Sequence, residues 1–150
     1  MQVSEILAEK SGPIASTTAE SSIHDVAKVL RDRKIGLLVV CGPGDKIVGV
    51  LSERDIVRGF ADQGAGVAQA TVGDLMTKDV QTCEPGDDTG AVLRRLWMNN
   101  IRHMPVVENE VLVGVLSVRD LMKSLTQEGT SRARDVLIEV LKEGRYYPGA

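Results

Sequence analysis

The spacing of apolar residues predicts a series of short helices and strands in each half of the chain. In the first half, apolar residues at helical intervals predict a helix over 23–30. Two short apolar runs separated by a Gly/Pro turn then predict strands at 37–40 and 47–51. An extended stretch at 14–16 precedes this helix, and a second helix begins at Ser52. The second half repeats this β-α-β-β-α order, with the same elements expected at 80–82, 89–96, 103–107, 112–116 and from Ser117.

An internal repeat accounts for this recurrence. Residues 48–55 read VGVLSERD and residues 113–120 read VGVLSVRD, identical at seven of eight positions. Because a copy of about 60 residues buries its sheet poorly alone, we expect the two copies to pack sheet against sheet as a pseudo-twofold pair. The expected fold class is therefore α/β (α+β), with two repeats and a C-terminal helix. The expected domains are 3–62, 72–126 and a helical appendage over 127–150.

Composition narrows the possible functions. A net charge of −3, a pI near 5.4 and an aromatic share of 3% do not favour nucleic-acid binding, which needs basic surface and stacking rings. We find no apolar run near the ~18 residues that span a membrane and no leader signal at the N-terminus, so we predict a cytoplasmic protein. Cys41 and Cys83 form no CxxC pair and are expected to be buried reduced thiols. No nucleophile, metal-ligand or phosphate-loop motif is present, so we predict no enzyme, no required cofactor and no metal site.

The repeated segment has two interpretations. Residues 52–55 and 117–120 both read Ser-x-Arg-Asp at the start of a helix. Free N–H groups at a helix start form an anion site, and Arg54 and Arg119 supply charge for a phosphate. The same Ser-x-x-Asp spacing also resembles a capping box, which stabilises a helix start without any ligand. Capping alone does not require the same Arg and the same preceding Gly-Val-Leu in both copies.

These residues resemble a tandem pair of CBS (cystathionine-β-synthase) domains, a Bateman module. The resemblance covers about residues 3–126 and rests on Gly-h-h-Ser-x-x-Asp at 49–55 and 114–120, where h is apolar, and on IRHMPVV at 101–107. It implies a stand-alone regulatory sensor whose clefts between the repeats accept AMP, ADP, ATP, S-adenosylmethionine or, in some members, NAD(H). It also implies a homodimer that passes its signal to an unidentified effector protein. The alternative is a structural dimerisation module with empty clefts.

The resemblance further implies residue roles. Asp55 and Asp120 would bind the ribose hydroxyls. One cleft would combine Ile14, Ala15, Gly36 and Leu37 on the base side with Ser117, Arg119 and Asp120. The other would combine Val80, Gln81, Ile101 and Met104 on the base side with Ser52, Arg54 and Asp55.

The copies differ where Gly36-Leu37 of the first stands against Arg102-His103 of the second. Adjacent strand residues point to opposite faces, so we expect only one of Arg102 and His103 to face the phosphate side of a nucleotide. Either one brings a cation, or a group that becomes one near neutral pH. We therefore expect the cleft containing Asp55 to favour a phosphorylated ligand. The alternative for His103 is a hydrogen-bonded histidine at the sheet edge.

The appendage carries an apolar stripe, which needs burial. We expect the stripe to extend the dimer contact or to dock on a partner, and Tyr146 and Tyr147 to belong to a terminal stop or tail. The stripe consists of Ala133, Val136, Leu137, Val140 and Leu141.

Overall fold

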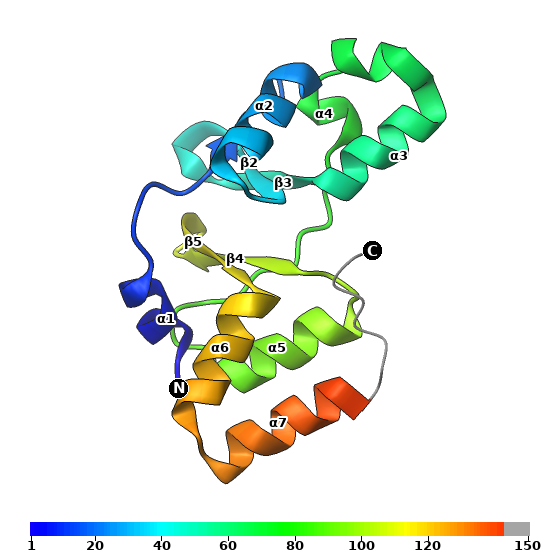
Figure 1. Ribbon diagram of the computed structural model, residues 1–150. Coiled ribbons are helices and arrows are strands. Elements are labelled where there is room, and N and C mark those ends of the chain that lie inside the picture. The colour runs from blue at the N-terminus through cyan, green and yellow to red at the C-terminus, as the bar shows by residue number, and fades with distance from the viewer. Residues whose placement is uncertain (143–150) are drawn as a thin grey trace. The chain divides into compact units, whose positions relative to one another are not determined.

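The computed structural model describes residues 1–142, which divide into two compact units (Figure 1). Unit 1 comprises Met1–Gly12, Thr82–Glu108 and the chain from Val113 onward. Unit 2 comprises Pro13–Gln81 and Asn109–Leu112. None of the helices within residues 1–142 combines the length and the hydrophobicity that a membrane span requires.

Unit 2 contains the first predicted β-α-β-β-α series. Its sheet has the order β1-β2-β3, with β1 parallel to β2 and β2 antiparallel to β3. Ser22 starts α2 by accepting a hydrogen bond from the Asp25 amide (3.1 Å), and Lys34 ends it in the left-handed conformation. The elements are β1 (Ser16–Thr17), α2 (Ile23–Arg33), β2 (Leu37–Cys41), η1 (Pro43–Asp45), β3 (Ile47–Ser52), α3 (Glu53–Gln63), η2 (Gly64–Gln69) and α4 (Val72–Leu75).

Unit 1 contains the second series, with one difference from the expected order. Its elements are α1 (Val3–Glu9), α5 (Thr89–Met98), β4 (His103–Glu108), β5 (Val111–Ser117, from Val113 onward), α6 (Val118–Glu128) and α7 (Ser131–Lys142), and β4 pairs with β5. The strand predicted at 80–82 does not form, and a single parallel bridge joins Cys83 to Val106 instead. A turn closed by the Asp87 amide on the Glu84 carbonyl (3.0 Å) follows at once, so the chain leaves the sheet after one residue.

In each unit, the sheet and helices of one repeat pack with the leading helix of the other repeat, that is, with the helix at which that other repeat begins. The helix α1 begins the first repeat, yet its Val3 and Ile6 are buried in unit 1, which holds the later elements of the second repeat. The amide of Val3 donates to the Asp87 carbonyl (3.0 Å) and fixes this position. In unit 2, the fully buried Val72 of α4 packs in the same way, and its amide donates to the Ser21 carbonyl (2.8 Å).

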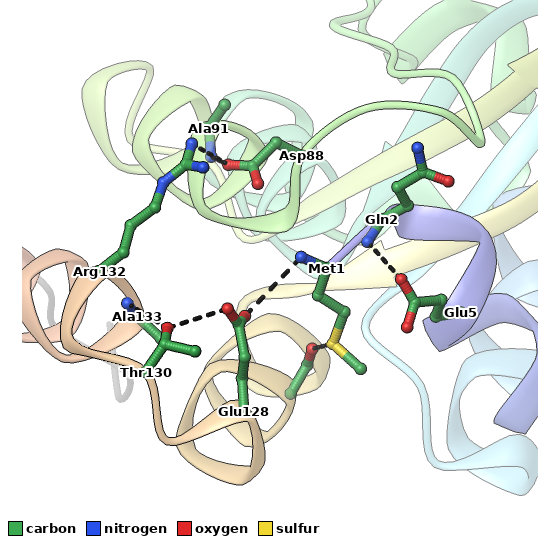
Figure 2. Close-up of polar contacts among 10 residues, drawn as sticks. Met1, Gln2, Glu5, Asp88, Ala91, Glu128, Thr130, Arg132 and Ala133 are labelled. Carbon is green, nitrogen blue, oxygen red and sulfur yellow. Dashed lines mark hydrogen bonds and ion pairs between the residues drawn. The ribbon is translucent and has the colours of Figure 1, made fainter.

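The C-terminal helix α7 packs on its own chain, against α5 and α6 of unit 1 (Figure 1). Thr130 caps it by accepting from the Ala133 amide (3.1 Å), and Arg132 reaches Asp88 at the start of α5 (3.3 Å), as Figure 2 shows. Ala133, Val136 and Val140 are buried in the core of unit 1, so the expectation that the stripe serves a dimer or partner is wrong for these residues. The predicted tail with Tyr146 and Tyr147 lies outside the described residues.

Candidate functional site

The two Ser-x-x-Asp segments form the same hydrogen-bonded helix start. In α3, the Ser52 amide donates to Asp55 Oδ2 (2.9 Å) and the Asp55 amide donates to Ser52 Oγ (3.3 Å). In α6, the corresponding distances between Ser117 and Asp120 are 2.9 Å and 3.1 Å. Both segments are therefore capping boxes, as the structural interpretation of the sequence predicts.

Capping leaves these helix starts with fewer donors than the sequence suggests. The Glu53 amide donates to the Gly36 carbonyl (3.0 Å), and the Val118 amide donates to the Arg102 carbonyl (2.9 Å). Together with the amides of the two capping boxes, these groups are already bonded within the protein. The prediction of free N–H groups facing a ligand is therefore wrong for these amides.

The glycine of each repeated motif accommodates another part of the same chain. A Cβ on Gly49 would lie 2.8 Å from Met76 Sδ and 2.9 Å from the Thr77 carbonyl oxygen. A Cβ on Gly114 would lie 2.5 Å from Leu7 Cδ2. The sequence predicts a close approach at these glycines, and the structure shows that the approaching groups belong to the segments carrying α4 and α1.

Asp55 is buried, and both of its carboxylate oxygens have partners. Its side chain is 8% exposed, and Oδ2 accepts from the amide and the hydroxyl of Ser52. Oδ1 accepts from Thr77 Oγ1 (3.2 Å) and lies 3.9 Å from Arg58 Nη1. This carboxylate is therefore used mainly to hold α3 and the segment after α4 in place.

Asp120 is more open, and a cation lies beside it. Its side chain is 26% exposed, and Oδ2 accepts from the Ser117 amide and from Lys10 Nζ (2.8 Å). Lys10 Nζ also donates to the Val115 carbonyl oxygen (2.9 Å). Asp120 Oδ1 accepts no hydrogen bond from residues 1–142. The sequence analysis missed Lys10, because it belongs to no motif and lies 110 residues from Asp120 along the chain.

The charges around Asp120 shift two pKa values. Burial acts to raise the pKa of the Asp120 carboxyl, but hydrogen bonds from Lys10 and Ser117 and the charge of Lys10 outweigh it, so this pKa lies below 3.8. The pKa of His103 lies below 6.5, mainly because of burial and also because of Lys10 and Arg102, although Asp120 opposes the shift. At pH 7 we therefore take His103 as neutral and Lys10 and Arg102 as the cations of this group.

The residues predicted to contact a base differ in their exposure. Met104 is fully buried in the core of unit 1, and Ile101 packs against that core. In unit 2, Ala15 packs against the core and Ile14 is exposed. The remaining four, Gly36, Leu37, Val80 and Gln81, are partly buried. Of the arginines of the two motifs, Arg119 is exposed and Arg54 is partly buried.

Both cysteines are free, and the expectation of buried thiols holds for Cys83 but is wrong for Cys41. Cys83 is buried, and burial together with Asp87 raises the pKa of its thiol to about 11, against the opposing effect of Arg95. Cys41 is partly buried, and its pKa is also raised, first by burial and then by Asp45. Within residues 1–142, no cluster of His, Cys, Asp and Glu side chains is arranged to hold a metal ion.

Comparison with known proteins identifies relatives across most of the chain. The sequence profile of the CBS domain family matches residues 3–62 and 72–127. A mitochondrial CBS domain-containing protein of Arabidopsis thaliana, CBSX3, is 30% identical over 116 residues, which cover 74% of this chain and 56% of that protein. The chain thus spans about half the length of this relative.

Two similar solved structures contain adenosyl compounds. A CBS domain protein from Pyrobaculum aerophilum, complexed with AMP, is 28% identical with a TM-score of 0.73, over 95% of this chain and 99% of that one. The CBS domain pair of the protein MJ0100, in complex with 5′-methylthioadenosine and S-adenosyl-L-methionine, is 25% identical with a TM-score of 0.75, over 85% of this chain and 98% of that one.

Proposed function

The chain belongs to the CBS domain family, and on this premise we propose that it is a non-catalytic regulatory module that binds an adenosyl ligand. The ligand class is supported by the similar structures that hold AMP, 5′-methylthioadenosine and S-adenosyl-L-methionine. On this proposal the protein requires no cofactor, and the adenosyl compound is its regulatory signal. The cytoplasmic location, the homodimer and the effector protein that receives the signal remain predictions from the sequence.

The state of the Asp120 carboxylate carries this proposal. A carboxylate that accepts both ribose hydroxyls is a common means of nucleotide recognition. Asp120 is partly exposed, is anchored through Oδ2, and has Oδ1 available as an acceptor. Asp55 is almost fully buried and is bonded through both oxygens. We therefore assign ribose binding first to Asp120, with Ser117 and Arg119 on the phosphate side. Arg102 and His103, which the sequence analysis grouped with Asp55, belong to the same unit as Asp120 and are assigned to its phosphate side instead.

Ligand binding is tested by thermal unfolding and calorimetric titration with AMP, ATP, NADH and S-adenosylmethionine. We expect at least one of them to raise the melting temperature of the wild-type protein, because a ligand that binds only the folded state stabilises it. Asp120→Asn should weaken binding about tenfold, since it removes a charged acceptor of hydrogen bonds. Asp55→Asn is the matched control, and we expect it to change the affinity less.

The alternative function is a structural dimerisation module without a ligand. The observation in its favour is that both Ser-x-x-Asp segments are satisfied internally as capping boxes. No stabilisation by any of the four compounds at millimolar concentration would support this alternative and contradict ligand binding. Turnover of a nucleotide during incubation, followed by chromatography, would contradict a non-catalytic role.

A further inference from the structure

The ammonium group beside Asp120 has a consequence for the choice of ligand. We propose that Lys10 is a specificity-determining residue, which favours adenosyl ligands with an anionic 5′ substituent (the nucleoside phosphates) over the sulfonium cation of S-adenosylmethionine. This inference rests on the proposed function and names the ligand class of that same site. It depends on how Lys10 is held, on its remaining hydrogen-bond donor and on the charges around it.

The docking of α1 fixes Lys10 next to Asp120. Val3 and Ile6 anchor this helix in the core of unit 1, and Leu7 packs over Gly114 of β5. Lys10 follows α1 in an extended backbone conformation, with its amide bonded to the Leu7 carbonyl (3.2 Å). The position of its side chain is therefore set by packed structure, although Lys10 lies on the surface.

The ammonium group keeps one donor for a ligand. An ammonium has three N–H donors, and two of them reach Asp120 Oδ2 (2.8 Å) and the Val115 carbonyl oxygen (2.9 Å). No third acceptor for Lys10 Nζ is present among residues 1–142, and its side chain is 44% exposed. A ribose held on Asp120 Oδ1 would bring its 5′ substituent into the neighbourhood of this donor.

The ammonium group of Lys10 supplies positive charge beside the carboxylate. Lys10 and Arg102 both lower the pKa of His103, which is neutral at pH 7, and Asp120 acts on that pKa in the opposite sense. A phosphate at the 5′ position would be attracted to this group, and a sulfonium at the same position would be repelled. A salt-dependent preference is expected, because the cations are partly exposed to solvent.

The same position in unit 2 lacks this cation. There the segment after α4 reaches the carboxylate with a neutral group, Thr77 Oγ1, which donates to Asp55 Oδ1 (3.2 Å). That carboxylate forms an ion pair with Arg58, at 3.9 Å, whose side chain is 72% exposed. The two copies of the motif therefore differ in the group that contacts the aspartate, although their sequences are nearly identical.

Calorimetric titrations with AMP, neutral 5′-methylthioadenosine and S-adenosylmethionine test the inference. In Lys10→Gln we expect AMP to bind about tenfold more weakly, 5′-methylthioadenosine within about twofold of the wild type, and S-adenosylmethionine more tightly. Lys10→Arg, which keeps the charge, should retain the wild-type order. Added salt should reduce the difference between AMP and 5′-methylthioadenosine more in the wild type than in Lys10→Gln. Thr77→Val is the matched control in unit 2 and should leave the order unchanged.

The outcomes separate this inference from the proposed function. An equal loss of affinity for all three compounds in Lys10→Gln, with folding confirmed by circular dichroism, would show that Lys10 only positions Asp120 and would overturn the inference. An unchanged ratio of the AMP and S-adenosylmethionine affinities would overturn it as well. Binding of none of the three to the wild-type protein would instead overturn the proposed function, and this inference with it.

Discussion

Replacing Gly49 by alanine should lower the free energy of unfolding by about 1–2 kcal/mol, because the cost of overpacking exceeds the gain from the smaller chain entropy of the unfolded state. The added Cβ would lie 2.9 Å from the Thr77 carbonyl oxygen and 2.8 Å from Met76 Sδ. The Thr77 backbone cannot easily retreat, because it exchanges two hydrogen bonds of 2.9 Å with Val50. Overpacking of this kind costs about 1–3 kcal/mol. The smaller conformational freedom of alanine in the unfolded chain offsets up to about 1 kcal/mol of this cost.

Gly114→Ala should cost less, although the two motifs are identical around the glycine. Its new Cβ would meet only the end of the Leu7 side chain, which can change rotamer at a cost of about 0.5–1.5 kcal/mol. The entropic gain then leaves a net change within about 0.5 kcal/mol. Gly66→Ala, where no atom lies within 4 Å of the added Cβ, is the control, and only the entropic gain of up to about 1 kcal/mol is expected there.

The free energies of unfolding of the three variants are measured by urea unfolding, which is monitored by circular dichroism. The midpoints are compared with a common m-value, the slope of the free energy against urea concentration. A Gly49→Ala variant as stable as Gly66→Ala would refute the close approach of the Thr77 backbone. A Gly114→Ala variant that loses as much stability as Gly49→Ala would refute the distinction between a fixed backbone neighbour and a flexible side chain.

Three further measurements test the electrostatics, the packing and the thiols of the fold. Because the folded-state pKa of Asp120 lies below 3.8, this carboxylate stabilises the fold above about pH 4 and loses that contribution as the pH falls through the folded-state value. The acid part of the stability profile should therefore flatten in Asp120→Asn, and an unchanged slope would contradict the role of the Lys10 contact. In α7, Val136→Ala should cost about 2 kcal/mol on urea unfolding, whereas Leu141→Ala, at a position 65% exposed, should cost less than about 0.5 kcal/mol. Equal effects of these two changes would mean that α7 does not dock on the core. A thiol reagent at pH 8 should modify the native protein at Cys41 well before Cys83, whose thiol is buried with a pKa of about 11. Mass spectrometry of the labelled protein measures the order of modification, and earlier labelling of Cys83 would contradict its burial.

Local patterns were sufficient to predict most elements and both helix starts of the motif. The apolar spacing at 23–30 predicts α2, and Ser-x-x-Asp at 52–55 and 117–120 predicts the capping boxes that the structure contains. Helical periodicity and capping involve residues three or four positions apart, so the sequence holds all the information they need. The strand predicted at 80–82 does not form, and the one residue that pairs with β4 there is Cys83, directly after the predicted stretch.

The sequence by itself determined that the chain is a duplicated α/β protein with a capped Ser-x-x-Asp helix start in each copy. Only the tertiary structure decided that α1 packs with the second repeat, that Lys10 therefore reaches Asp120, and that α7 covers α5 and α6 of its own chain. The physical reason is that each repeat has an apolar core on which a leading helix can pack, so no local pattern indicates which copy it joins. That choice depends on contacts between residues as far as 110 positions apart. It makes Lys10 the partner of one aspartate and Thr77 the partner of the other.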